Sequence, residues 1–374
     1  MRKRKELFRS LCLVLCLSLT MGVLAGCSWF SGNEQATPAP EGSQTPGEAE
    51  AADVKKPALP EKLTMKDGTP WVQVYVVADE KVEDMDIETY VQGVLAGEMR
   101  NDWPMEALKA QAILARTFVL KFVSEKESRY EGADISTDIT EAQAYNAAEI
   151  NERIEQAVAE TCGQVLLTAS GELPYAWFHA HSGGKTALAR EGLGWNDPEP
   201  TYTRVTDGLD SPEAPAEAAA WNAVFPVKQF LRACRATGAD TETAEEVAIG
   251  EKGESGRAVT LLVDGVSVPA AELRLALSST VMRSTLLTEL SSDGAYVRMA
   301  GRGYGHGVGM PQWGAYALAA DGMAGEEIAV FYFDGVHVAR LWDMPVPGQT
   351  ALLPHDSLSL AGKSLRLHHR MCIM

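Results

Sequence analysis

The sequence is short of positive charge, and this shortage argues against one large class of partners. Its 374 residues include 33 Lys and Arg against 51 Asp and Glu, which gives a formal net charge of −18. Proteins that bind nucleic acid present a basic surface to the phosphates, so nucleic acid is not an expected partner. The charge fits a neutral or weakly charged substrate instead. Apolar residues still make up 46% of the chain, which is enough to build a core.

Cysteine is also rare, and its spacing argues against a metal centre. The six cysteines stand at positions 12, 16, 27, 162, 234 and 372. The last three lack the spacing of metal ligands. A disulfide between Cys162 and Cys234 could form outside the membrane, although nothing in the sequence requires it. We expect neither a metal nor another cofactor.

The apolar run near the N-terminus, from Leu11 to Leu24, is shorter than a transmembrane helix normally requires. Basic residues precede it, and Leu24-Ala25-Gly26-Cys27 ends it. Small residues directly before a cysteine resemble the bacterial lipobox, in which the cysteine is lipidated and becomes the new N-terminus. We therefore expect residues 1–27 to be a lipoprotein signal peptide, and Cys27 to anchor an extracytoplasmic protein to the cell membrane. An ordinary cleaved signal peptide is the alternative.

The pattern after the leader predicts a tether and then an α+β fold. Residues 28–65 are rich in Pro, Ala and Glu and are expected to be disordered. A β-rich run predicts a strand at 72–77, and apolar stripes predict helices over 86–99, 104–126 and 150–162. Strands are expected at 164–167 and 175–179, and an acidic loop at 211–220. A hairpin should turn at Asp264-Gly265, and a helix should cover 311–320. We expect mixed helices and an antiparallel-rich sheet.

Glu98 is the sharpest anomaly in this pattern. It continues the apolar stripe formed by Ile87, Val91 and Val94, and no cation stands next to it in the sequence. A carboxylate in apolar surroundings is poorly solvated as an anion, so its pKa should rise towards neutral. That is the state a general acid needs. An exposed residue at a fraying helix end is the competing interpretation.

The second helix repeats the anomaly at Gln111. Gln111 is the polar member of an apolar seam that includes Leu108 and Ala115. A core glutamine usually satisfies backbone groups, but one facing Glu98 could orient its carboxyl or hold a sugar hydroxyl. Arg116 lies on the flank of this helix, where we expect it to pin a loop by paired hydrogen bonds.

A histidine cluster follows the expected strand at 175–179. His179 and His181 have the H-x-H spacing that zinc sites use, but a zinc hydrolase would need His306 as a third ligand, and no acidic zinc motif occurs. Ser182 lacks the Gly-x-Ser-x-Gly context of a nucleophile elbow. We therefore expect neither chemistry here.

The loop Gly301–Ala315 carries five glycines at alternate positions, interleaved with Tyr304, His306, Gln312 and Trp313. Alternate glycines let a backbone approach a ligand or another strand closely, and the interleaved side chains can stack on sugars or bond to them. Without a βαβ context, the Gly-x-Gly match does not indicate a nucleotide site. A purely structural turn is the alternative.

Three segments in this order resemble the SpoIID/LytB family of spore-forming bacteria and their relatives. The first runs from Tyr90 to Thr117 and contains Gly97-Glu98-Met99, the second runs from Gln143-Ala144-Tyr145 to His179–Thr186, and the third is the Gly301–Ala315 loop. The resemblance spans roughly residues 70 to 340. It implies a catalytic domain over 66–340, with a smaller lobe inserted at about 208–298, and a C-terminal tail over 341–374.

The resemblance also implies an activity. Family members cleave peptidoglycan glycan strands between N-acetylmuramic acid and N-acetylglucosamine, leaving a 1,6-anhydro end, and the family's catalytic glutamate falls on Glu98. Ordinary glycosidases need two carboxylates, whereas a lytic transglycosylase needs one, because the 6-hydroxyl of the sugar attacks the anomeric carbon. This would be an enzyme of cell-wall remodelling, with sporulation as one setting.

The expected groove follows from the same motifs. We expect its lining to include Gln111, Tyr145, His179, Tyr202, His306 and Gln312. Arg116 and Trp313 should hold its shape. Some relatives bind zinc through a cysteine where this chain has Ser182, so the resemblance implies no zinc here. The family also includes amidase enhancers, so a non-catalytic wall-binding protein with a cell-wall amidase as its partner is the alternative.

Overall fold

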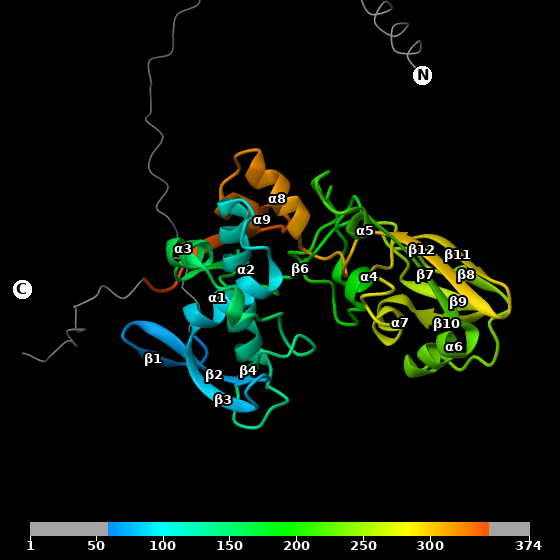
Figure 1. Cartoon of the computed structure of the whole chain (residues 1–374), viewed down its shortest axis with the longest axis horizontal. Coiled ribbons are helices and arrows are strands. Elements are labelled where there is room, and N and C mark those ends of the chain that lie inside the picture. The colour runs from blue at the N-terminus through cyan, green and yellow to red at the C-terminus, as the bar shows by residue number, and fades with distance from the viewer. Residues whose placement is uncertain (1–58, 344–374) are drawn as a thin grey trace, which may run out of the picture. The chain divides into compact units, whose positions relative to one another are not determined.

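The computed structural model describes residues 59–343, which contain both helices and mostly antiparallel sheets (Figure 1). This confirms the predicted α+β class. The expected signal peptide with Cys27, most of the expected tether and most of the expected tail lie outside the described residues. Between residues 59 and 343, no helix is both long and apolar enough to cross a membrane.

The first sheet contains the strand predicted at 72–77. It consists of β1 (Thr64–Lys66), β2 (Thr69–Val76), β3 (Lys81–Asp86) and β4 (Ile135–Ser136). β2 pairs antiparallel with β1 and β3, and parallel with β4. Val72, Val74 and Val76 alternate along β2 and are buried, so one face of this sheet packs into the core.

Three helices form where the apolar stripes predicted them. α1 (Ile87–Glu98) begins at Asp86, whose carboxylate accepts a hydrogen bond from the Thr89 N–H. α2 (Met105–Glu125) begins after Pro104, a residue that suits a helix start. α3 (Glu152–Glu160) is capped by Asn151 and follows the short 3₁₀ helix Ala147–Glu149. α2 packs against both α1 and α3.

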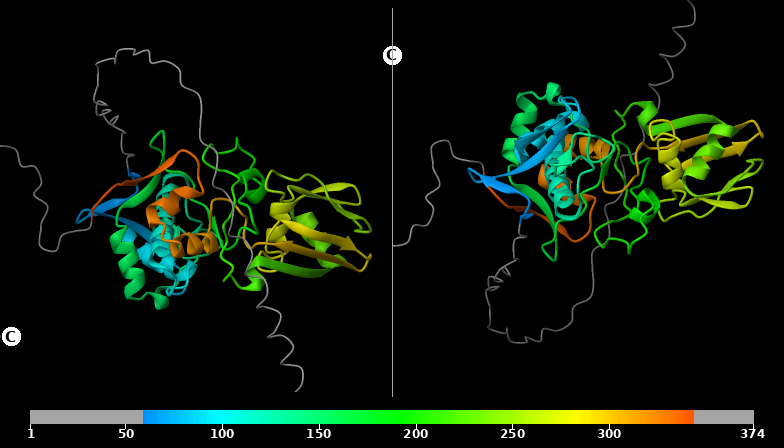
Figure 2. Two further views of the ribbon diagram at one scale, coloured as in Figure 1. Left: turned by 90° about the horizontal axis from the view of Figure 1, so that it is seen from above. Right: turned by 90° about the horizontal axis from the view of Figure 1, so that it is seen from below.

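The end of the described chain returns to this first core. The predicted helix α8 (Gln312–Ala320) and the following α9 (Gly325–Phe331) pack against α2, and both views in Figure 2 show these orange helices beside the cyan ones. β14 (Val336–Arg340) pairs antiparallel with β5 (Gln164–Thr168), and β13 (Met310–Pro311) pairs parallel with β6 (Phe178–His179). Residues before 180 and after 300 thus share one hydrophobic core.

A second hydrophobic core lies between these two halves in the sequence, over residues 221–299. Its elements are grouped together in Figure 1. They are β7 (Ala220–Pro226), α6 (Val227–Ala236), β8 (Val247–Ile249), β9 (Thr260–Val263), β10 (Val266–Pro269), α7 (Ala270–Ala276), β11 (Leu287–Ser292) and β12 (Tyr296–Arg302). They form two sheets, ordered β10-β9-β8 and β11-β12-β7. The predicted β9–β10 hairpin is confirmed, and Asp264 and Gly265 both have positive φ at its turn.

Three expectations need correction. The loop expected at 211–220 contains a short helix, α5 (Ala216–Ala219), because Pro215 and the Ala/Glu run after it favour a helical turn. The strand expected at 175–179 shrinks to the two residues of β6, since Tyr175 and Trp177 instead stack on each other with ring centroids 5.1 Å apart. Cys162 and Cys234 are buried in different cores as free thiols, so the disulfide considered between them does not form.

One further short helix, α4 (Ala189–Leu193), follows β6.

Candidate active site

Glu98 is the last residue of α1, with its side chain at the edge of a pocket of about 380 Å³. Its Oε1 accepts a hydrogen bond of 2.7 Å from the Ala144 N–H, and the Gln312 side chain donates to its backbone carbonyl at 3.2 Å. Burial raises the pKa of the Glu98 carboxyl to about 7, because it penalises the charged form more than the hydrogen bond from the Ala144 N–H favours it. The residue sits at a helix end, as the competing interpretation had it, but it is largely shielded from water.

The pocket is assembled from chain segments far apart in the sequence. Its lining comes from the end of α1, from α2, from residues 142–143 and 177–180, from α4, and from residues 304–306 and 312. Among the lining residues Glu98 is the only acid. The geometry therefore offers one carboxyl group with neutral polar groups around it.

Two of these segments are held together by a ladder of backbone hydrogen bonds. Met310 N–H donates to the Trp177 carbonyl, Trp313 N–H donates to the Ala180 carbonyl, and His181 and Tyr304 exchange two bonds. Gly303, Gly305, Gly307 and Gly309 all have positive φ, the region that favours glycine. A Cβ at Gly305 would come 2.6 Å from the His179 Cβ. The alternate glycines predicted to allow close approach therefore bring His306 beside His179.

His179 is buried and faces the pocket with a free ring nitrogen. Its Nδ1 lies 3.2 Å from the Val308 carbonyl oxygen, which can only accept, so Nδ1 carries the proton. Burial and the neighbouring His306 lower the pKa of His179 well below its usual value, which keeps the ring neutral. Nε2 is consequently an unprotonated acceptor, and it has no hydrogen-bond partner.

His306 also lines the pocket, with its ring centroid 5.6 Å from that of His179. Its Nδ1 accepts a hydrogen bond of 3.0 Å from the Val308 N–H. Burial lowers the pKa of His306 to about 3, so this ring is neutral as well and carries its proton on Nε2. Neither histidine can supply a proton as a cation near neutral pH.

Gln143 is a polar lining residue to which the sequence analysis gave no role. It is 3% exposed, and neither its amide nitrogen nor its amide oxygen has a hydrogen-bond partner. Buried amides are normally paired, so an unpaired amide in a pocket wall indicates a place for a polar ligand. The signal in the sequence was its position next to Ala144-Tyr145 in the second motif, but its burial is visible only in the fold.

Three of the expected lining residues lie outside the pocket lining. Gln111 is fully buried on α2 with both amide atoms unpaired. Tyr145 packs on α1, and Tyr202 accepts a hydrogen bond from the Tyr175 N–H at 3.0 Å. The structure thus brings Glu98, His179, His306 and Gln312 together and sets Gln111, Tyr145 and Tyr202 apart from them.

The two residues expected to hold the shape are placed in the framework. Arg116 is fully buried and binds the Glu88 carboxylate, with Nη2 2.6 Å from Oε2, while its Nη1 donates to the Gln164 carbonyl. Trp313 packs on Trp103 with ring centroids 4.5 Å apart and the rings tilted by 51°. The Arg116 pair joins α1, α2 and β5, and the Trp313 contact joins α8 to the segment before α2.

The His-x-His segment divides between two different environments. His181 Nδ1 accepts from the Gly183 N–H and lies 3.3 Å from Asp210 Oδ2, which also bonds to Ser182. His179 points to the pocket instead. Over residues 59–343 no group of three His, Cys, Asp or Glu side chains has the arrangement of a metal site. Ser182 is fully buried and bonded to a carboxylate rather than to a histidine.

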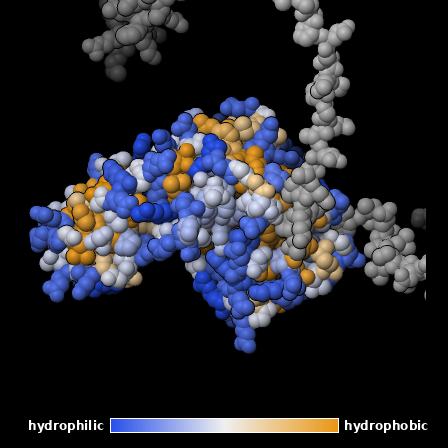
Figure 3. All heavy atoms as spheres, turned by 180° about the vertical axis from the view of Figure 1, so that it is seen from behind, coloured by the Kyte–Doolittle hydropathy of each residue, from blue (hydrophilic) through white to orange (hydrophobic). Residues whose placement is uncertain are grey.

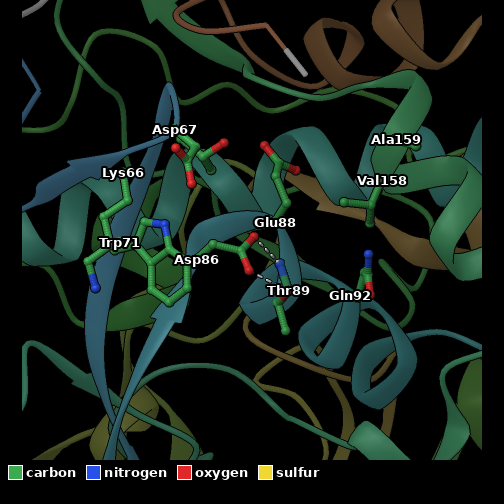
Figure 4. Close-up of a pocket in the computed structure, with 10 residues that line it drawn as sticks. Lys66, Asp67, Trp71, Asp86, Glu88, Thr89, Gln92, Val158 and Ala159 are labelled. Atoms are coloured by element: carbon green, nitrogen blue, oxygen red, sulfur yellow. Dashed lines mark hydrogen bonds between the residues drawn. The ribbon is translucent and has the colours of Figure 1, made fainter. Parts of the chain in front are cut away.

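A second pocket lies near the other end of α1, between β1, β2 and α3 (Figure 4). Lys66 and Trp71 form one wall, with the ammonium 4.2 Å from the ring centroid. Two of its carboxylates are already committed, since Asp86 caps α1 and Glu88 binds Arg116, the Gly163 N–H and the Trp342 indole. These groups stabilise the fold, and Glu98 does not line this pocket.

Known proteins resemble this chain along most of its length. A family model described as stage II sporulation protein (SpoIID) matches residues 78–167. Stage II sporulation protein D of Bacillus subtilis is 28% identical over 347 residues, which cover 88% of this chain and 94% of that protein. An uncharacterised protein of Brachyspira hyodysenteriae is 31% identical over 258 residues, covering 69% of this chain and 67% of that protein.

A further relative is named for a different role. The amidase enhancer of Bacillus subtilis is 27% identical over 294 residues, which cover 66% of this chain but only 39% of that protein. The region matched by the family model includes Glu98 and the Gln143–Tyr145 segment. The chain belongs to the SpoIID/LytB family, which acts in cell-wall remodelling.

Proposed function

We propose that the protein is a peptidoglycan lytic transglycosylase with Glu98 as its catalytic acid and base. Glu98 would protonate the glycosidic oxygen between N-acetylmuramic acid and N-acetylglucosamine. It would then take the proton from the 6-hydroxyl of the muramic acid as that oxygen attacks the anomeric carbon. The products would be a free 4-hydroxyl and a 1,6-anhydro end, and no water would be consumed.

One observation carries this proposal: the pocket holds a single carboxyl whose pKa is raised to about 7. A group with this pKa is partly protonated at neutral pH and can both give and take a proton. Hydrolysis by the ordinary route needs a second carboxylate about 5–10 Å away as nucleophile or base. The lining of this pocket contains no second acid. Glu98 also lines a second hollow, whose acids are Asp102, paired with Arg100, and the exposed Glu149. With no second acid in the pocket itself, an internal nucleophile supplied by the sugar is favoured.

The other lining groups suit the hydroxyl and acetamido groups of a glycan. Gln143 offers an unpaired amide, and His179 Nε2 offers an unpaired acceptor, so hydroxyl or acetamido groups could replace the missing partners. Trp177 and Tyr304 add aromatic surface in the same lining.

The test is product analysis of glycan strands treated with the wild type and with Glu98→Gln. We expect anhydro-muropeptides or anhydro-disaccharides from the wild type and a loss of at least about 1,000-fold in the variant, because the amide cannot transfer the proton. Mass spectrometry identifies the anhydro end by its missing water. Glu149→Gln, at an exposed position in the other hollow that Glu98 lines, is the matched control and should retain activity, since the proposal gives no role to a second carboxylate. Equal activity in Glu98→Gln would remove Glu98 from the role.

The second candidate function is a wall-binding enhancer of an amidase, and the relative named amidase enhancer favours it. This function predicts no product from glycan strands alone and faster turnover by a cell-wall amidase when the two proteins are mixed. The Glu98→Gln variant separates the candidates, because it would enhance an amidase as well as the wild type does if the role is not catalytic.

We also propose that Cys27 carries a lipid that holds the protein at the outer face of the cell membrane. The lipobox-like Leu24-Ala25-Gly26-Cys27 supports this, with the segment up to residue 65 as a tether and residues 66–340 as the catalytic domain. The mass of the mature N-terminal peptide tests it, and an unmodified Cys27 would contradict it.

A further inference from the structure

The segment Gln143–Asn146 lies directly against two glycines of α1. A Cβ added at Gly97 would come within 2.7 Å of the Tyr145 backbone nitrogen and within 2.8 Å of the Ala144 carbonyl carbon. Both are backbone atoms, which cannot rotate away as a flexible side chain can. Only glycine therefore allows the two backbones to touch at this position.

Three further contacts fix the segment on the helix. The Asn146 N–H donates to the Gly93 carbonyl at 2.9 Å. The Tyr145 ring fills the space over Gly93, where an added Cβ would come 2.1 Å from a ring carbon, and it stacks on Tyr90 with centroids 5.7 Å apart. Between these anchors, the Ala144 N–H donates to Glu98 Oε1 at 2.7 Å.

We infer that this seat, formed by Gly97, Ala144 and Tyr145, is a positioning device that fixes the orientation of the Glu98 carboxyl. A backbone N–H moves only with its segment, so a segment locked against α1 holds its acceptor more firmly than a free side chain would. The seat also adjusts proton affinity, because this N–H favours the carboxylate while burial disfavours it. Tyr145, expected to line the groove, acts here through Glu98 instead. The inference rests on the proposed function only in taking Glu98 to be the acid.

The decisive measurement is the pKa of Glu98 itself. It is obtained by ¹³C NMR titration of the protein with labelled glutamate, and the Glu98 resonance is assigned as the one missing from Glu98→Gln. In Gly97→Ala the added methyl displaces the segment, and the hydrogen bond from Ala144 is lost. We expect the pKa of Glu98 to rise by about one pH unit, since a hydrogen bond to a charged group contributes roughly that much. The alkaline limb of the pH–rate profile should move upward with it. The kcat should fall about tenfold with KM within about twofold of the wild type.

Two further variants keep the test decisive if Gly97→Ala does not fold. Tyr145→Ala removes the ring that anchors the segment and should shift the pKa in the same direction, whereas Tyr145→Phe keeps the ring and should not. Gln92→Ala, on the same helix but lining the other pocket, is the matched control and should behave like the wild type. The pKa measurement does not depend on turnover. A wild type that releases no anhydro product would therefore contradict the proposed function but leave this test of the inference valid. An unchanged pKa of Glu98 in folded Gly97→Ala or Tyr145→Ala, or equal shifts in Tyr145→Ala and Tyr145→Phe, would overturn the inference.

Discussion

At the scale of a single residue, the burial that raises the pKa of Glu98 also makes its ionised form unfavourable in the folded protein. Its pKa is about 7 in the folded protein, against an ordinary value of 4.5, so the folded state holds this proton more tightly than the unfolded chain does. A group with a raised folded pKa contributes stability below its unfolded pKa, and this contribution is lost as the pH rises through the folded pKa. Above pH 7 the fold must therefore accommodate a poorly solvated carboxylate.

This unfavourable ionisation predicts that Glu98→Gln stabilises the protein at alkaline pH. The amide cannot ionise, so at pH 8 the variant should exceed the wild type in free energy of unfolding by on the order of 2 kcal/mol, somewhat less than the full shift because the side chain is not completely buried. At pH 4.5 the two proteins should differ little. Urea unfolding at both pH values measures this difference. A variant no more stable than the wild type at pH 8 would show that Glu98 is ordinarily solvated.

The residue scale is also where sequence reasoning reached its limit. The helical stripe through Val91 and Val94 marked Glu98 as out of place, and burial has raised its pKa as that pattern predicted. Gln143 had no such mark, since a glutamine in a loop is ordinary until the fold buries it without a partner. Tyr145 and Tyr202 were expected in the groove from the resemblance to the family, and in the structure Tyr145 packs on α1 while the Tyr202 hydroxyl accepts a hydrogen bond from the Tyr175 N–H.

At the scale of elements, the position of Glu98 depends on how α1 sits on α2. The buried pair of Arg116 and Glu88 joins these helices, and Glu88 also accepts hydrogen bonds from the Gly163 N–H and the Trp342 indole. One carboxylate near the start of α1 thus ties together α2, the turn before β5 and the end of the described chain. Its partners satisfy it fully, which is the condition under which a buried ion pair is tolerated.

Breaking this pair should be costly. Arg116→Met leaves the Glu88 carboxylate buried without its cation, and we expect a loss of about 3–5 kcal/mol in the free energy of unfolding. Arg298→Met is the matched control, since its pair with Asp293 is about half exposed on both sides and should contribute less than about 1 kcal/mol. Chemical denaturation of both variants gives the comparison. Adding Glu88→Gln to Arg116→Met should recover part of the loss, and equal losses in Arg116→Met and Arg298→Met would contradict the assignment.

The elements were predicted unevenly, and the reason is physical. α1, α2 and the β9–β10 hairpin were foreseen because their period or turn residues are local signals. The strands β7, β11 and β12 were not, although Trp221, Ala223 and Phe225 alternate along β7 and are buried. β12 pairs with β7 across some seventy residues, and a pairing between segments so far apart leaves little trace in either one.

At the scale of the whole described chain, the two hydrophobic cores are separate clusters of buried side chains. The surface around them is mixed, and on the face shown in Figure 3 the apolar groups are interrupted by hydrophilic ones. Arg257 is fully buried next in the chain to Ala258 of the second core, and its guanidinium donates to the carbonyls of Ser182 and Lys185. It also packs on Gly307, where an added Cβ would come 2.4 Å from the guanidinium carbon. One side chain thereby ties the second core to both segments that hold the pocket histidines.

Removing this tie should uncouple the two cores. In Arg257→Met the carbonyls of Ser182 and Lys185 lose their donors, and a buried acceptor left unpaired costs about 1–3 kcal/mol. We expect the wild type to unfold in one calorimetric transition, and the variant to unfold in two or in one much broader transition with a lower onset. Arg235→Met is the matched control, because Arg235 is exposed and donates within its own core, to the Thr241 carbonyl. Arg257→Met, but not Arg235→Met, should also lose activity, since His179 and His306 would no longer be held in register. A single, unshifted transition in Arg257→Met would mean that the cores are joined by their remaining contacts, such as the bonds from Ser255 to Glu191, and that the pocket does not depend on Arg257.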